Sequence, residues 1–154
     1  MVGGSINTRT ISFEQIREML CRTALVFSIM LVIALVHLFR AGTYLQGSLF
    51  TLYYSYFSDI VIPFGMYFLL CLEDVYIRFL KDWRVKAMLV FGVASSTEVM
   101  QAFDVPLLGQ TFDPLDFVMF AGGVLLAALV DRFLFDRLFS FWTPKTGVPS
   151  VAAR

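Results

Sequence analysis

Long apolar stretches separated by short charged segments constrain the fold of this 154-residue chain more than any other feature. Each stretch approaches the roughly 20 residues that a helix needs to cross a bilayer. Hydrophobic residues make up 58% of the chain and charged residues 16%, whereas soluble domains are typically about one quarter charged. The excess apolar surface predicts an all-α integral membrane bundle of four transmembrane helices. The predicted spans are residues 22–39, 54–72, 85–103 and 115–135.

Basic residues are distributed unevenly around these spans. Apart from Arg40, every Lys and Arg lies before or at the start of the first span, between the second and third spans or at the start of the third, or at the end of the fourth and beyond it. Cytoplasmic segments of membrane proteins are enriched in Lys and Arg, so the pattern predicts that both termini are cytoplasmic. We therefore expect a multi-pass membrane protein. A net charge of zero gives no indication of a nucleic acid partner, and membrane lipids are the expected surroundings.

The segments at the two ends of the chain are expected to lie outside the membrane. Residues 1–21 are predicted to form a cytoplasmic segment with a short interfacial helix, and residues 22–143 the transmembrane domain. Residues 144–154 are expected to form a disordered cytoplasmic tail. The interfacial helix is predicted because three apolar residues share one helical face. They are Phe13, Ile16 and Leu20.

Charged and aromatic residues near the basic segments suggest local contacts. A spacing of four residues predicts the ion pairs Asp74–Arg78 and Asp82–Lys86. The aromatic residues after the fourth span, including Trp142, are expected to anchor the chain in the headgroup layer.

Acidic residues gather at the opposite, outer ends of the second, third and fourth spans. A charged group inside the hydrocarbon costs roughly 2.5–3.5 kcal/mol on insertion scales, so such groups usually face the bundle interior and serve function. We therefore expect a pocket that faces outward and is lined by carboxylates. Its candidate residues are Glu98, Gln101, Asp113, Asp116, Asp59 and His37.

Helical spacing gives further expectations for this outer end. Asp113 precedes Pro114, which is typical of a helix N-cap. Glu98 is expected to accept a hydrogen bond from a backbone amide at the start of the fourth helix. Asp104 is expected to be a solvated loop residue. Gly123 lies on a face of small residues that permits close approach of another helix.

One motif extends over the third and fourth spans. Glu98-Val-Met-Gln101 is followed by Phe112-Asp113-Pro-Leu-Asp116 and then by Gly122-Gly123. This order resembles the VanZ-like family of small bacterial membrane proteins, and the likeness covers about residues 56–126. It implies a cell-envelope role, because the founding member of the family is associated with resistance to the glycopeptide antibiotic teicoplanin.

The chain also departs from the pattern of that family. Gly109-Gln110 stands where the family has an arginine in the outer loop, and Met119 or Phe120 stands where it has an asparagine. The second span lacks the lysine and histidine of the family, although Asp59 and Tyr67 resemble the rest of that segment.

Three functions are open. The first, which we favour, is a non-enzymatic envelope protein whose pocket binds a cationic group, a lipid-linked wall precursor or an amphiphilic drug. The second is an accessory subunit in contact with a larger membrane protein complex. The third is an intramembrane enzyme for a lipid-linked substrate, with Glu98 as general base. No cofactor is predicted, except that in the enzyme Asp113 and Asp116 could hold a divalent cation, because oxygen-only sites suit Mg²⁺ or Ca²⁺.

Overall fold

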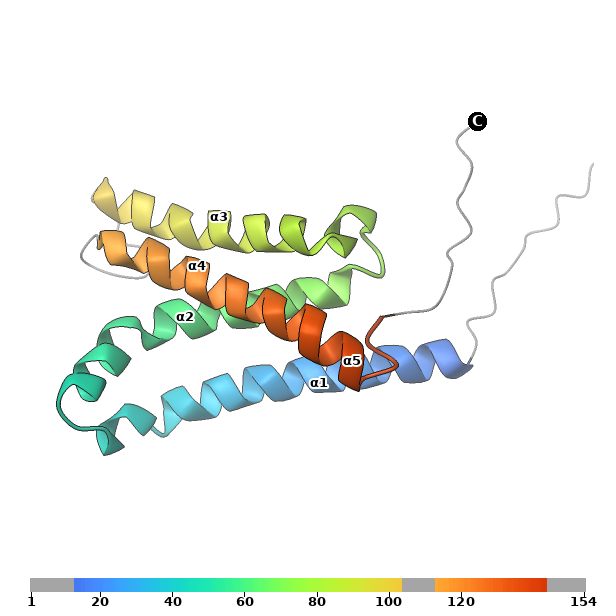
Figure 1. The fold of residues 1–154 in the computed structure, drawn as a ribbon, viewed down its shortest axis with the longest axis horizontal. Coiled ribbons are helices and arrows are strands. Elements are labelled where there is room, and N and C mark those ends of the chain that lie inside the picture. The colour runs from blue at the N-terminus through green and yellow to red at the C-terminus, as the bar shows by residue number, and fades with distance from the viewer. Residues whose placement is uncertain (1–12, 104–112, 144–154) are drawn as a thin grey trace, which may run out of the picture.

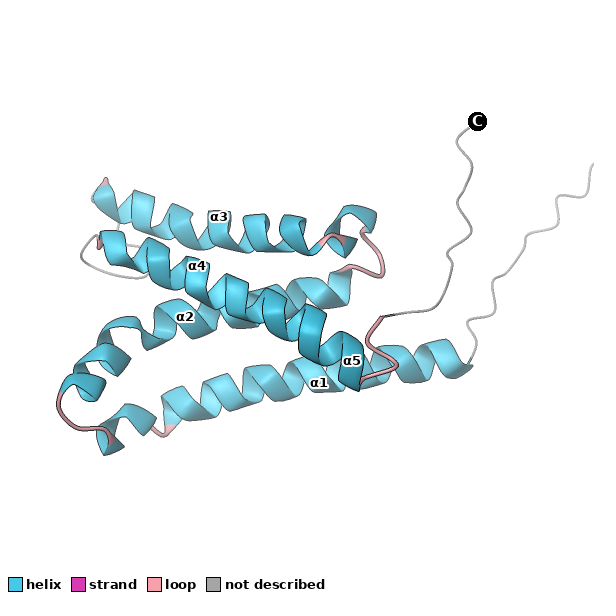
Figure 2. Cartoon of the chain, viewed as in Figure 1, coloured by secondary structure: helices cyan, strands magenta, loops and turns pink. Residues whose placement is uncertain are grey.

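The computed structural model describes residues 13–103 and 113–143, and these residues form helices and turns with no strand (Figures 1 and 2). The first helix, α1, spans Phe13–Leu38. A 3₁₀ turn, η1 (Ala41–Tyr44), then leads into α2 (Ser48–Glu73). The predicted all-helical fold is confirmed for this part of the chain.

The second half of the chain begins with another 3₁₀ turn, η2 (Arg78–Lys81), followed by α3 (Trp83–Ala102). Helix α4 (Pro114–Leu129) continues directly into a π-helix, η3 (Val130–Phe135), and then into the short α5 (Asp136–Leu138). A π-helical turn places an extra residue in the helical path and is often found at functional sites. The side chains after residue 129 are therefore rotated relative to a continuous α-helix.

An aspartate side chain caps the N-terminus of α3 and another caps that of α4. The Asp82 side chain accepts a hydrogen bond from the backbone N–H of Arg84 at 2.9 Å. Asp113 accepts one from the N–H of Leu115 at the same distance, and Pro114 occupies the first helical position. These are the contacts expected of N-caps. The predicted cap at Asp113 is confirmed, whereas Asp82 caps α3 and makes no ion pair with Lys86.

The long helices lie side by side, with α2 packed against each of the other three (Figure 1). The closest approach is between α2 and α4. A Cβ atom added at Gly123 would collide with the backbone carbonyl oxygen of Ile60, so only glycine fits there. The prediction that Gly123 lies on a close-packing face is confirmed. The buried side chains of Tyr67, Phe68 and Val90 belong to the hydrophobic core of the bundle.

Three helical segments are long and apolar enough to cross a membrane: α1, α2 and the continuous stretch Pro114–Leu138. Many large apolar side chains on them are exposed, including Phe27, Leu31 and Leu125, as expected of a lipid-facing surface. The shorter α3 is not among the three, and it carries Lys86 and Glu98. A membrane protein is therefore supported, and the fourth span stays a prediction.

In the N-terminal region, residues 13–21, expected to form an interfacial helix that leads into the first span, are the first turns of α1, which continues unbroken to Leu38. An interfacial position of these turns stays a prediction. The expected tail (144–154) lies outside the described residues, as do Asp104 and the outer-loop pair Gly109-Gln110.

Charged side chains gather at the two ends of the bundle. At the acidic end, the last turns of α3 meet the start of α4 near Glu98 and Asp116. At the basic end, α1, the end of α2, the start of α3 and η3 come together around Arg22 and Lys86.

Candidate functional site

Glu98 is the most deeply buried residue of the predicted pocket. Its relative exposure is 4%, although it lies near the C-terminal end of α3. Gln101, one turn further along the helix, donates from Nε2 to Glu98 Oε1 at 3.1 Å. The backbone N–H of Asp113 donates to Oε2 at 3.4 Å. The expected contact between Glu98 and an amide at the start of the fourth helix is therefore present.

Two further carboxyl groups lie beside Glu98. Asp116, in the first turn of α4, lies within electrostatic range of Glu98. Asp59 on α2 lies within electrostatic range of both Glu98 and Asp113. The structure thus brings together the acidic candidates from three helices, as the sequence predicted.

His37 makes its contacts with residues outside this group. Its Nδ1 lies 2.8 Å from the carbonyl oxygen of Ile33 and its Nε2 lies 3.1 Å from Ser58 Oγ. The imidazole ring also packs against Phe57, with 5.5 Å between ring centroids. Both ring nitrogens are therefore engaged, so His37 links α1 to α2 and does not complete the pocket.

The carboxyl groups at the acidic end lack a basic partner within the described part of the chain. None of the ion pairs formed there involves Asp59, Glu98, Asp113 or Asp116. Residues 13–103 and 113–143 also contain no group of three His, Cys, Asp or Glu residues placed to hold a metal ion. A divalent cation between Asp113 and Asp116 stays a prediction.

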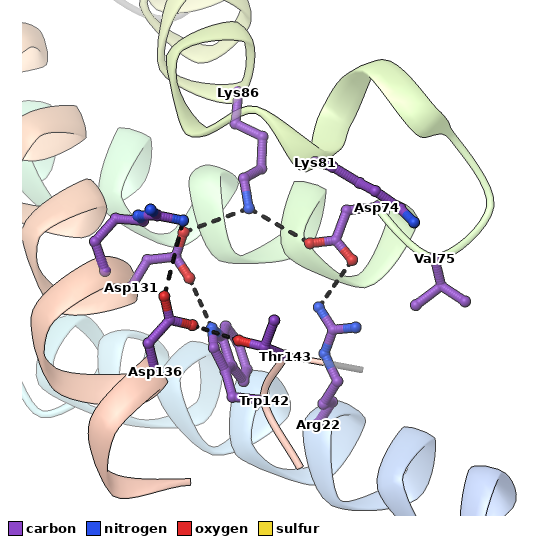
Figure 3. A pocket seen from close by; sticks show the side chains of 10 residues that line it. Arg22, Asp74, Val75, Lys81, Lys86, Asp131, Asp136, Trp142 and Thr143 are labelled. Carbon is purple, nitrogen blue, oxygen red and sulfur yellow. Dashed lines mark hydrogen bonds and ion pairs between the residues drawn. The ribbon is translucent and has the colours of Figure 1, made fainter. Parts of the chain in front are cut away.

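A second buried polar cluster, which the sequence interpretation missed, lies at the basic end (Figure 3). Lys86 Nζ lies 3.4 Å from Asp131 Oδ2 and 3.5 Å from Asp74 Oδ2. Arg22 Nη2 lies 2.9 Å from Asp74 Oδ1 and donates to the backbone carbonyl of Cys71 at 2.6 Å. Because Arg22, Lys86 and Asp131 are each at most 5% exposed, these are buried ion pairs.

Neutral donors complete this cluster. The Tyr67 hydroxyl donates to Asp131 Oδ2 at 2.8 Å, and the Trp142 indole N–H donates to Oδ1 at 2.6 Å. The Lys86 ammonium also contacts the Cys71 sulfur at 3.1 Å. A buried carboxylate with partners on both oxygens is well satisfied, so Asp131 is the acceptor that ties α2, α3 and the residues after α5 together.

These contacts correct two predictions. Asp74 pairs with Arg22 and Lys86 and not with Arg78. Trp142 is 3% exposed and folds back over the cluster, so it is not a headgroup anchor. The sequence feature that could have indicated this cluster was the presence of charged residues within apolar helical stretches, because such residues usually face the bundle interior.

Comparison with family models, with curated proteins and with solved structures finds no match. The resemblance to the VanZ-like family therefore stays a prediction.

Proposed function

We propose that this chain is a multi-pass protein of the bacterial cytoplasmic membrane with four spans and both termini in the cytoplasm. The length and apolar character of α1, α2 and the α4–α5 stretch support a membrane location. The concentration of Lys and Arg at one end supports the orientation. In this proposal α3 is the fourth span, because it packs against both α2 and α4.

In this orientation the acidic end faces outward and binds the cationic group of an amphiphile or a lipid-linked molecule, without a chemical reaction. The observation that carries this function is the burial of Glu98 beside Asp116 with no basic partner among the described residues. Asp74 and Asp131, at the other end, are neutralised by Lys86. A buried carboxylate is unfavourable without a compensating charge, and an ammonium group of a ligand would supply it.

The residues that resemble the VanZ-like family support the context of this proposal. The matching segments, 98–101 and 113–116, are the same residues that surround the buried carboxylate. A cell-envelope ligand, such as a lipid-linked wall precursor or an amphiphilic drug with an amino group, has the required charge and an apolar part that stays in the bilayer.

Binding of a fluorescent alkylammonium probe tests this function. The full chain in mild detergent is titrated with dansyl-labelled dodecylammonium, and the matching uncharged dodecyl alcohol reports adsorption to the micelle. We expect Glu98→Gln to weaken binding of the ammonium probe by about tenfold or more, because a buried charge partner is lost. Glu73→Gln removes an exposed carboxylate at the basic end and should leave affinity unchanged.

The thermal unfolding midpoints of both variants are measured alongside. The Gln side chain has the size of Glu and keeps a hydrogen-bonding amide, so we expect the fold to persist. Equal affinity of the Glu98→Gln variant and the unmodified chain for the ammonium probe, at similar midpoints, would contradict the proposed function.

A further inference from the structure

A cavity opens beside the buried ion pairs at the basic end of the bundle (Figure 3). Its volume is about 150 Å³, far more than the roughly 10–15 Å³ that admits one water molecule. It lies at the opposite end from the proposed cation pocket. Its lining includes the charged side chains of Arg22, Asp74, Lys81, Lys86, Asp131 and Arg132.

The acidic groups in this lining are already satisfied by the protein. Both oxygens of Asp131 accept hydrogen bonds from Trp142 and Tyr67. The oxygens of Asp74 are taken by Arg22 and Lys86. Asp136, the third acidic residue of the lining, accepts a hydrogen bond from Thr143 at 2.6 Å and lies 3.8 Å from Arg132 Nη1. These three carboxylates therefore have little remaining capacity to bind a cation in the cavity.

The basic groups, in contrast, are not fully engaged by contacts with the described residues. Arg22 is 3% exposed, and its Nε and Nη1 atoms are buried without a hydrogen-bond partner among the described residues. The guanidinium lies over the Trp142 ring, 5.1 Å from the centroid, but that contact engages its face and supplies no acceptor for the N–H groups of Nε and Nη1. Buried N–H groups without acceptors are costly. Lys81 forms no ion pair with any described residue.

We propose that this cavity binds a phosphate group, with Arg22 donating from Nε and Nη1 inside and Lys81 supplying a second positive charge. Arginine suits this task because its charge is permanent and its planar N–H donors match phosphate oxygens. The same chemistry fits the headgroup of an anionic lipid of the inner leaflet and a free phosphate, and the experiment separates these two sources.

Fluorescence of Trp142, which lines the cavity, reports binding directly. The chain contains two tryptophans, so Trp83→Phe leaves Trp142 as the reporter. This full-length variant in mild detergent is titrated with inorganic phosphate, with chloride at equal ionic strength as the reference. In a second titration, dioctanoyl phosphatidic acid is compared with uncharged dioctanoylglycerol.

A matched pair of variants identifies the residues responsible. Lys81→Gln and Arg78→Gln each remove one positive charge from η2, but of the two residues only Lys81 lines the cavity. We expect Lys81→Gln to weaken phosphate binding by about fivefold, the scale of one exposed charge-assisted contact, and Arg78→Gln to have no effect. Arg22→Lys keeps the charge but loses the planar donors, and should weaken binding by about tenfold or more.

A saturable response to inorganic phosphate supports a free phosphate as ligand, and a response to phosphatidic acid alone supports a lipid headgroup. No saturable response to either would overturn the proposal, as would equal affinities of the Lys81→Gln and Arg78→Gln variants. If Arg22→Lys fails to fold, the comparison of Lys81→Gln with Arg78→Gln still tests whether the cavity binds phosphate. The outcome of these phosphate titrations does not depend on whether the acidic end binds a cation.

Discussion

Lys86 on α3 and Asp131 on η3 lie 45 residues apart in the sequence, yet Lys86 Nζ and Asp131 Oδ2 are separated by 3.4 Å in the interior of the bundle. The same ammonium reaches Asp74 at 3.5 Å, so one lysine serves two carboxylates. Removing one member of a buried ion pair is much more destabilising than replacing the pair, because an uncompensated charge is left behind. The following predictions use this and other contacts.

Lys86→Met should lower the free energy of unfolding by about 3–5 kcal/mol, because Asp131 and Asp74 would lose their shared cation. Unfolding by a denaturing detergent, followed by far-UV circular dichroism, measures the change. Arg78→Met, at an exposed position of η2, should alter stability by less than about 0.5 kcal/mol. Adding Asp131→Asn to Lys86→Met should restore part of the loss, and a strictly additive double variant would argue against the ion pair.

Gly123→Ala should lower the free energy of unfolding by about 1–3 kcal/mol, because the new methyl group would collide with the Ile60 carbonyl and separate α2 from α4. Gly122→Ala is the control. No described atom outside its own helix lies within 4 Å of a Cβ at that position, and alanine favours a helix by about 1 kcal/mol over glycine. Thermal unfolding should rank the Gly122 variant at or above the unmodified chain, and the reverse order would contradict the close contact.

Tyr67→Phe should lower the free energy of unfolding by about 1–3 kcal/mol, because the buried Asp131 carboxylate would lose a hydrogen-bond donor. The matched variant Tyr44→Phe removes a hydroxyl from a residue that is 85% exposed and should be nearly neutral. Chemical unfolding of the two variants under identical detergent conditions gives the comparison. A similar stability for both would show that Asp131 does not depend on the hydroxyl.

Topology reporters test the proposed four spans. We expect fusions after Leu45 and Leu108 to report an outer location, and fusions after Lys81 and Lys145 a cytoplasmic one, because basic residues favour the cytoplasm. A cytoplasmic result at Leu108, with the others unchanged, would mean that neither α3 nor α4 crosses the membrane and that the two form a re-entrant hairpin. Alkaline phosphatase and green fluorescent protein fusions provide opposite signals at each site.

The acidic end was predictable because its contacts are local or repeat with helical period. An aspartate before a proline specifies the start of α4, and Glu98 and Gln101 share one face of α3. The small residues around Gly123 indicated a packing face in the same way. The contact between His37 and Ser58 was not predictable, because it joins α1 to α2 across 21 residues of sequence.

The basic end was not predictable by the same reasoning, because its contacts join distant segments. Tyr67 and Asp131 are 64 residues apart, and the π-helix changes the side-chain period just where Asp131 occurs. The unbroken course of α1 has a local explanation. Residues 13–38 contain no glycine or proline, so nothing interrupts the helix between the predicted interfacial segment and the first span.

The charged members of the basic end come from successive parts of the chain, since Arg22 lies on α1, Asp74 follows α2, Lys86 lies on α3 and Asp131 follows α4. Arg22, Asp74 and Lys86 all precede Asp131 in the sequence, so a chain that ends before Asp131 carries one more basic than acidic group in this cluster. Charge balance within the cluster is reached only when the last helix packs against the others.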